Sequence, residues 1–274
     1  MSTLSDIDIK RELGINIYIY PYNKGNLKGA NYNLTASEFA WSLSTKQRIY
    51  NSQNKKIIIE PGDTALIETN ETIWVSKKIM GTYHSRVTQV SHGTGHIGTT
   101  LDPNYIGPSL IAVHNHSNDP IELIPEETHF VTLAFQYLSS ESSKDKHGNN
   151  HGRLEILSKV GIILTTDEEN ALNKDYMIET EALLSKLEEC QDYQVIRQSR
   201  QNKIKKFSIR KFYWGLSFII ILLIITSTIL SVNKKKLESN NWYQPATYAI
   251  EKSIEAIIVV IITLTTNKLL NQDQ

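Results

Sequence analysis

The stretch EPGDTALIETNETIWV, residues 60–75, decides the fold class. It opens with the turn sequence EPGD and continues with two short runs, TALIET at 64–69 and ETIWV at 71–75. Both runs favour β-strands and are too short for stable helices. Short strands separated by turn residues at this spacing are typical of a sandwich or barrel rather than of βαβ units.

The same pattern continues on both sides of this stretch. The turn residues lie in PYNKGN, LDPN and SNDP, and the β-type runs are INIYIY (15–20), KKIIIEPGD (55–63), SLIAVHN (109–115), IELIP (121–125) and HFVTLAFQYL (129–138). A short helix is expected before them at Ser5–Leu13, where Ser5 or Asp6 can act as the N-cap. We therefore expect a mainly β domain over residues 1–138.

Two segments of different character follow this domain. Residues 139–152 are polar and rich in turn formers, and residues 153–164 could add one more strand, so 139–165 is expected to be a linker. From residue 166 the β signal is lost, and apolar residues recur at roughly helical spacing. We interpret 166–211 as a helical stalk that ends in the basic sequence KIKKFSIRK (203–211).

Residues 212–232, FYWGLSFIIILLIITSTILSV, carry no charged side chain. At a rise of about 1.5 Å per residue, this stretch can cross a hydrocarbon core of roughly 30 Å as a helix. A buried core helix is the alternative, but core helices rarely stay apolar over such a length. Basic residues beside a span favour the cytosolic side, which predicts a protein of the inner cell membrane with a cytosolic N-terminal domain.

A second, weaker span is expected at 248–270, after a polar loop at 233–247. Its apolar centre is short, and Glu251, Lys252 and Glu255 lie near one end. With these charges at an interface the segment can just cross. An interfacial helix is the alternative, so the sequence predicts one or two transmembrane helices.

The composition narrows the classes of function. Lys and Arg total 29, as do Asp and Glu, so the net charge of +0 gives no general attraction to nucleic acid. Cys190 is the one cysteine, which excludes an internal disulfide and fits a reducing compartment. The opening residues, MSTLSDIDIKREL, lack the apolar region of a secretory signal, so we expect the front of the chain in the cytosol.

Six motifs in residues 4–138 together resemble the trimeric dUTPase and dCTP deaminase superfamily. In chain order they are LSDIDIKREL (4–13), GANYNLTAS (29–37), EPGDTALIETNETIWVSKKIMGTYHSR (60–86), IGTTLDPNYIG (97–107), SLIAVHN (109–115) and IELIPEETHFVTLAF (121–135). The resemblance implies a jelly-roll-like or distorted-barrel fold that assembles as a homotrimer, with nucleotide pockets between subunits.

The resemblance also implies a set of nucleotide-binding residues. A turn at 99–105 would read the base edge, Asp102 would bind the sugar hydroxyl and, in an enzyme, orient a water, and Tyr105 would stack under the deoxyribose. Arg86 would pair with phosphate oxygens, for which its forked donors are suited. The implied site comprises Arg86, Thr88, Thr99, Thr100, Asp102 and Tyr105. Each also has a plain structural interpretation, as a β-turn residue, a core ring or a surface ion pair.

Several positions depart from the family pattern. Ala112 stands where the deaminases carry a proton-transferring glutamate, and alanine cannot act as a general acid or base. Asn33 replaces an aspartate that helps dUTPases hold magnesium through water. Val87 replaces a phosphate-binding serine, and Ser91 stands where the deaminases have a second arginine. These departures predict weak or absent catalysis, with Asp102 as the one catalytic carboxylate that remains.

Histidines near these motifs raise the question of a metal. None of them has a cysteine or carboxylate partner at ligand spacing, so no metal site is predicted, although they could donate to phosphates instead. Mg²⁺ accompanying a nucleotide is the one cofactor expected. The histidines concerned are His84, His92, His96, His114 and His116.

Two functions fit these observations best, and a scaffold that keeps only the trimeric fold is a third possibility. The first is a membrane-anchored nucleotide sensor with a degenerate domain, coupled to a membrane pore or effector module, as in bacterial stress responses or anti-phage defence. The alternative is an active membrane-tethered deoxynucleotide enzyme, a dUTP pyrophosphatase or a dCTP deaminase. The expected partners are a deoxynucleoside triphosphate or another nucleotide signal, the membrane and further copies of this chain, but no nucleic acid.

Overall fold

The computed structural model describes residues 2–95, 98–143, 153–237 and 240–270. The chain divides into two compact units, Met1–Arg197 and Gln198–Gln274, which are described one at a time. Part of the expected linker, residues 144–152, lies outside the described residues, as does His96.

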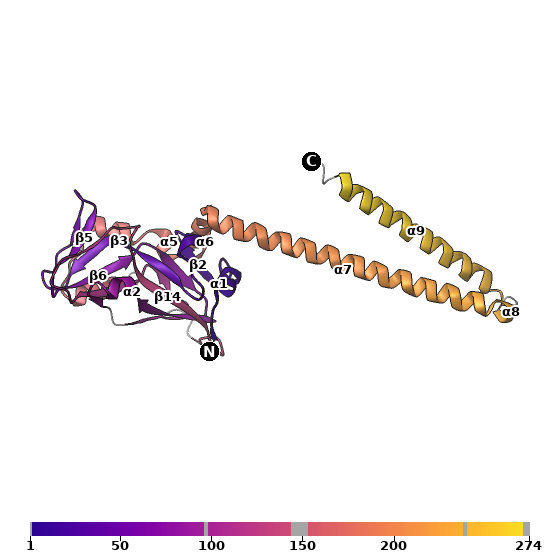
Figure 1. Cartoon of the computed structure of the whole chain (residues 1–274), viewed down its shortest axis with the longest axis horizontal. Helices are drawn as coiled ribbons and strands as arrows, with labels where there is room; N and C mark the ends of the chain where they lie inside the picture. Colours follow the sequence, from indigo (N-terminus) through magenta and orange to yellow (C-terminus); the bar gives the residue numbers. More distant parts are fainter. Residues whose placement is uncertain (1, 96–97, 144–152, 238–239, 271–274) are drawn as a thin grey trace. The chain divides into compact units, whose positions relative to one another are not determined.

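The first unit is built mainly of short antiparallel strands (Figure 1). They are β1 (Ser2–Thr3), β2 (Ile17–Tyr20), β3 (Tyr32–Ser42), β4 (Tyr50–Asn51), β5 (Lys56–Ile59), β6 (Thr64–Thr69), β7 (Thr72–Val75), β8 (Ile79–Ser85), β9 (Thr94–Gly95), β10 (Thr100–Leu101), β11 (Ile106–Gly107), β12 (Leu110–Asn115), β13 (Ile121–Leu123) and β14 (His129–Tyr137). This arrangement confirms the mainly β domain.

The largest sheet has the strand order β10-β8-β14-β3-β6-β12-β9, and β1 pairs with β14. The long strand β3 joins its two halves, because its first half pairs with β14 and its second half pairs with β6. The pairing register shifts between Ala36 and Ala40, and such irregularities bend a strand and increase its twist. The sheet therefore curls around the core rather than lying flat.

Two three-stranded sheets complete the β structure, with the orders β11-β7-β2 and β13-β5-β4. Their inner faces pack against the large sheet around one core of fully buried side chains, among them Ile19, Leu34, Ile59 and Phe135. The expected N-terminal helix is present as α1 (Asp6–Glu12), and Ser5 is its N-cap in a capping box with Asp8.

The prediction that residues 153–164 could add a strand is wrong, because Leu154–Lys159 forms the helix α3. Leu154 and Leu157 lie on one side of this helix and pack against the large sheet, a contact that a strand with period 2 could not make in the same way. The helix α4 (Thr166–Leu172) follows, with Thr165 as its N-cap.

The expected stalk is also different from a single helix. Residues 175–189 form α5 (Asp175–Ile178) and α6 (Thr180–Glu189), and the first unit extends to Arg197. Leu183 and Leu187 of α6 are fully buried in the same core as the strands. Their four-residue spacing is that of a docked helix as much as that of a stalk.

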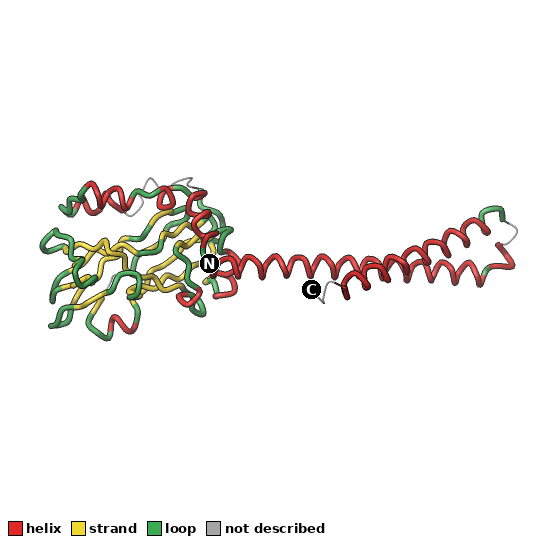
Figure 2. The backbone as a smooth tube through the Cα atoms, turned by 90° about the horizontal axis from the view of Figure 1, so that it is seen from above, coloured by secondary structure: helices red, strands yellow, loops and turns green. Residues whose placement is uncertain are grey.

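The second unit is a helical hairpin. The helix α7 (Gln191–Val232) runs into it from the first unit, and α8 (Lys234–Leu237) and α9 (Tyr243–Leu270) follow. After the turn, α9 runs back in the direction from which α7 came (Figures 1 and 2). Among the described residues, Trp214–Val232 is the helical stretch long and apolar enough to cross a membrane, with a mean hydropathy of 2.5 and no residue buried within the structure.

Candidate functional site

Four of the expected site residues lie at β10 and the turn that follows it: Thr99 precedes the strand, Thr100 begins it, and Asp102 and Tyr105 lie in the turn to β11. Thr100 and Leu101 pair with Thr82 and Gly81 of β8, which fixes the start of the turn on the large sheet. The backbone N–H of Tyr105 donates to the carbonyl of Asp102 at 3.2 Å, so the chain reverses within four residues. Thr99 joins the same arrangement, since its carbonyl accepts from the N–H of Tyr83 at 2.9 Å.

Asp102 is the most accessible acidic group of this turn. Its side chain is 34% exposed and accepts a hydrogen bond from the hydroxyl of Thr100 at 3.4 Å. Nη2 of Arg153 lies 3.8 Å from Oδ2 of Asp102. The carboxylate therefore has an accessible side, but an arginine of this chain already lies against it.

Tyr105 is a core residue in this structure. It is 5% exposed, and its hydroxyl donates to the carbonyl of Pro108. The guanidinium of Arg153 lies 6.0 Å from the centroid of its ring, at the outer limit of a cation–π contact. A sugar that stacked on this face of the ring would have to displace Arg153.

Arg86 and Thr88 lie at a separate hollow of about 390 Å³, whose lining also includes Lys28, Asn33 and His84. Arg86 is the N-cap residue of α2 (Val87–Val90), and its Nη1 donates to the carbonyl of His129 at 3.0 Å. The lining contains two cations and no carboxylate, which suits an anion. The turn residues 99–105 are not part of this lining.

The charge at this hollow also acts on its neighbour His129. Burial, together with the positive charges of Arg86 and Lys28, lowers the pKa of His129. The ring of His129 is held by Asn26, 2.7 Å from its Nε2. A neutral imidazole is the favoured form here, so the positive charge of the hollow comes from the arginine and the lysine.

Ala112 lies on β12, directly opposite Leu66 of β6. It packs against an apolar cluster whose buried members are Trp41, Leu66, Leu157, Ile162 and Leu172. No titratable side chain stands at this position, and α3 and α4 cover the face around it.

Sequence reasoning missed a buried carboxyl on the same face. Glu68 of β6 lies opposite Leu110, so it shares a sheet face with Ala112 and Leu66. It is 0% exposed, and neither of its carboxyl oxygens has a hydrogen-bond partner. Burial, and then the charge of Glu155, raise the pKa of Glu68 well above its ordinary range. Period-2 alternation in TALIET, which puts Glu68 beside Leu66, was the available signal.

A second buried carboxyl, Glu71, lies in the short connection between β6 and β7. It accepts hydrogen bonds from the backbone N–H and the hydroxyl of Thr35, both at 2.9 Å. Burial raises its pKa to about 7, against the lowering effect of these bonds. Glu71 and the exposed Glu126 both line a hollow of about 510 Å³ beside Cys190, at the start of α7.

The histidines do not gather around a metal in the part of the chain that the structure describes, where no group of three His, Cys, Asp or Glu could hold one. The rings of His114 and His116 lie 5.7 Å apart, but Nδ1 of His114 contacts the hydroxyl of Thr64 at 2.7 Å. His84 similarly contacts the hydroxyl of Thr82 at 2.9 Å.

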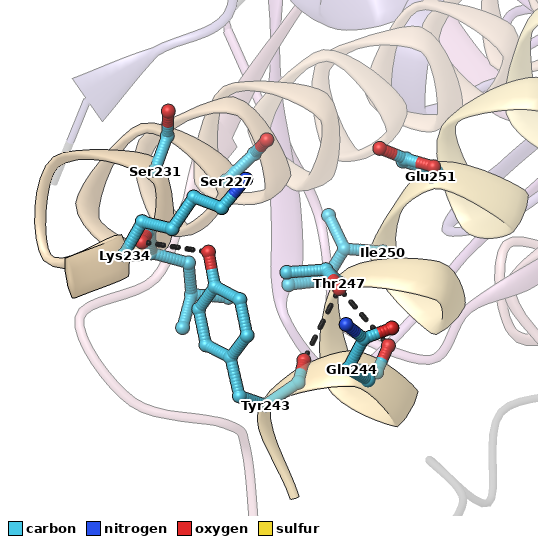
Figure 3. Close-up of a pocket in the computed structure, with 9 residues that line it drawn as sticks. Ser227, Ser231, Lys234, Tyr243, Gln244, Thr247, Ile250 and Glu251 are labelled. Atoms are coloured by element: carbon cyan, nitrogen blue, oxygen red, sulfur yellow. Dashed lines mark hydrogen bonds between the residues drawn. The ribbon is translucent and has the colours of Figure 1, made fainter. Parts of the chain in front are cut away.

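The helical hairpin of the second unit has a hollow of its own, of about 350 Å³ (Figure 3). Ser227 and Ser231 line it from α7, and Thr247 and Glu251 line it from α9. Tyr243 spans the two helices, since its hydroxyl donates to the carbonyl of Leu230 at 3.2 Å. Polar side chains thus gather between two helices that are otherwise strongly apolar.

Comparison with known proteins adds four findings. The family model described as dCTP deaminase-like matches residues 3–136. The dCTP deaminase of Thermococcus gammatolerans is 30% identical over 157 residues, which cover 57% of this chain and 96% of that protein. Among solved structures, a 2′-deoxycytidine 5′-triphosphate deaminase from Agrobacterium tumefaciens is 11% identical, with a TM-score of 0.41 over 50% of this chain and 48% of that chain. The native dUTPase of EIAV is 18% identical, with a TM-score of 0.34 over 49% of this chain and 98% of that chain.

Proposed function

The chain belongs to the dCTP deaminase-like family, and on this premise we propose that its β domain binds a deoxynucleoside triphosphate without deaminating it. One observation supports the absence of deamination. Ala112, which takes the place of the family's proton-transferring glutamate, packs in an apolar cluster and offers no group that can move a proton.

The proposed nucleotide site uses the two places described above. The Arg86–Thr88 hollow would take the phosphates, because it combines Arg86 and Lys28 without a carboxylate. The turn with Thr99, Thr100 and Asp102 would take the base edge and the sugar hydroxyl. A homotrimer would bring one subunit's hollow to another's turn. Mg²⁺ would arrive with the triphosphate, since the lining has no carboxylate to hold it.

The proposed effect of nucleotide binding is on the C-terminal helical hairpin. We propose that the apolar part of α7 anchors the chain in the inner cell membrane, with the β domain in the cytosol. Nucleotide binding would then be a signal, passed to a membrane hairpin that acts as a pore or effector. A bacterial stress or anti-phage response is the setting that such a device fits.

The alternative is an active membrane-tethered enzyme, a dUTP pyrophosphatase or a dCTP deaminase. Asp102 favours it, because its carboxylate is accessible and stands in the motif that orients a water in the family. Glu68 adds a second carboxyl on the sheet face of Ala112. The two functions therefore differ in turnover rather than in binding.

The test measures nucleotide-induced stabilisation and turnover on the same samples of full-length protein. A ligand at about 100 times its Kd raises the free energy of unfolding by about 2.7 kcal/mol. We expect dCTP or dUTP to produce a thermal shift, and we expect Asp102→Asn and Arg86→Ala to lose it while Lys10→Ala, a surface cation of α1, keeps it.

Turnover decides between the two functions. We expect no ammonia release from dCTP and no pyrophosphate release from dUTP, and Ala112→Glu is the variant expected to gain deamination. Release by the unmodified protein at roughly 1 per second or more, a rate ordinary for enzymes, would establish the alternative. Absence of a thermal shift with every nucleotide would remove both.

A further inference from the structure

Residues 153–172, here called the covering segment, lie over the sheet face that carries Ala112 and Glu68. The segment contains α3 and α4, and its buried side chains Leu157, Ile162 and Leu172 pack with Trp41 and Leu66 of the sheet. At its far end, Nε1 of Trp41 donates to Oε1 of Glu168 at 3.3 Å. The segment is thus attached to the sheet along its whole length.

Arg153 begins this segment and makes its contact with the proposed nucleotide site. Its guanidinium lies 3.8 Å from the Asp102 carboxylate and 6.0 Å from the Tyr105 ring centroid. These are the two side chains that would receive the sugar. The backbone of Arg153 is left-handed, with φ of 52°, a conformation that non-glycine residues rarely adopt. Surrounding contacts must hold it there.

Two carboxyl groups work against the docking of the segment. Both oxygens of Glu68 and Oε2 of Glu155 are buried without hydrogen-bond partners. Glu155 belongs to α3, so docking the segment is what places this carboxyl near Glu68. Burying polar groups without partners is unfavourable, whether or not the carboxyls are charged. Docking is therefore a balance between the apolar cluster and Arg153 on one side and these carboxyls on the other.

We propose that the covering segment is a built-in competitor of the nucleotide: Arg153 occupies Asp102 and Tyr105, and a nucleotide binds by displacing it and releasing the segment from the sheet. This inference rests on the proposed nucleotide site. Arg153 and a sugar hydroxyl would compete for the Asp102 carboxylate, and Arg153 lies over a face of the Tyr105 ring that a sugar would need. Along the chain the segment is followed by α5, α6 and α7.

The first experiment needs no nucleotide. Amide hydrogen exchange of residues 154–172 is measured in the full-length protein in detergent micelles, for wild type, Arg153→Ala and Lys159→Ala. Lys159 is the matched control, an exposed cation on the same helix. Arg153→Ala loses a partly exposed ion pair and a weak cation–π contact, so its exchange should be roughly five-fold faster than in wild type. Lys159→Ala should exchange at the wild-type rate. Equal exchange in all three would overturn the inference.

The second experiment adds dCTP and dUTP as separate probes. We expect Arg153→Ala to bind roughly five-fold more tightly than wild type, and Glu68→Met, which removes a buried carboxyl that opposes docking, to bind more weakly. In wild type, the nucleotide should accelerate exchange of residues 154–172, a result that does not depend on any variant folding. Weaker binding by Arg153→Ala, or slower exchange with nucleotide, would make Arg153 a ligand contact and overturn the inference.

The two experiments also separate this inference from the proposed function. If no protein binds either nucleotide, the proposed function fails and displacement fails with it, whatever the first experiment gives. If wild type binds but the covering segment exchanges at the same rate with and without nucleotide, the proposed function stands and the competitor does not.

Discussion

Glu71 shows what burial does to a single carboxyl in this domain. Its pKa of about 7 exceeds the ordinary value of 4.5, so the folded protein binds a proton more tightly than the unfolded chain does. The stabilisation from this proton is complete below the unfolded pKa and is lost as the pH rises through the folded pKa. Glu71 therefore favours the folded state at mildly acidic pH.

The free energy of unfolding should fall by about 2 kcal/mol between about pH 5.5 and about pH 8 on account of Glu71. Glu71→Gln cannot titrate and should remove most of this slope, although it weakens one of the two bonds from Thr35. Glu126→Gln is the control, because Glu126 lines the same hollow but is exposed. Urea unfolding at both pH values measures the difference. An unchanged slope in Glu71→Gln would show that Glu71 is charged when folded.

For single residues, the sequence indicated which positions belong to the candidate site better than it indicated what surrounds their side chains. The order of motifs assigned Ala112 to the glutamate position and Thr99, Thr100 and Asp102 to one nucleotide site, and these assignments stay predictions. It could not place Tyr105, because an aromatic residue after a turn is equally compatible with a pocket and with a core. It could not find Arg153, because the contact of Arg153 with Asp102 joins residues about 50 positions apart through the path of the chain.

Helices α3 and α4 act together as one element that covers the large sheet. Their attachment depends on Leu157, which is fully buried among Trp41, Leu66 and Leu172. Removing a buried leucine side chain leaves a cavity as well as losing apolar contact. An exposed apolar residue of the same element should contribute nothing comparable.

Leu157→Ala should reduce the free energy of unfolding, or of local opening of residues 154–172, by about 2–5 kcal/mol. Ile163→Ala is the matched control, since Ile163 lies in the same element and is 90% exposed. Amide exchange of the full-length protein reports local opening, and urea unfolding reports global loss. If Leu157→Ala and Ile163→Ala behave alike, the helices do not depend on this contact.

The sequence pattern did not predict how the helices between residues 153 and 197 pack. Local pattern gives the period of an element but not its partner. Leu183 and Leu187 fit a free stalk and a docked helix equally well, and only their complete burial against the strands decides. The strands that were predicted before residue 138 are bounded by turn residues, which need no distant partner to act, whereas β3 and β8 were not predicted.

At the scale of the whole molecule, the function depends on whether the helical hairpin forms an aqueous path or only anchors the chain. Glu251 lies eight residues after Tyr243, or about 12 Å along an α-helix. If Tyr243 lies at a membrane interface, Glu251 lies well inside the hydrocarbon layer, where a charge is unfavourable by about 2.5–3.5 kcal/mol at the centre. Glu251 lines the same hollow as Ser227, Ser231, Thr247 and the cation Lys234 (Figure 3). Such a group suits the wall of an aqueous path better than an anchor.

We therefore expect full-length protein with dCTP or dUTP to release a small dye from liposomes, while a chain truncated after Lys211 does not. Glu251→Gln should slow the release, because it removes the negative charge from the lining of the hollow, which also contains Lys234. Glu255→Gln is the matched control, since Glu255 lies one turn further on, outside the hollow, and pairs with Lys252 at 2.6 Å.

The competing interpretation is a hairpin that only tethers the β domain. A chimera in which one unrelated span replaces residues 212–274 separates the two, because a tether can be exchanged and a pore cannot. Dye release by that chimera at the wild-type rate would leave the hairpin with no role beyond attachment.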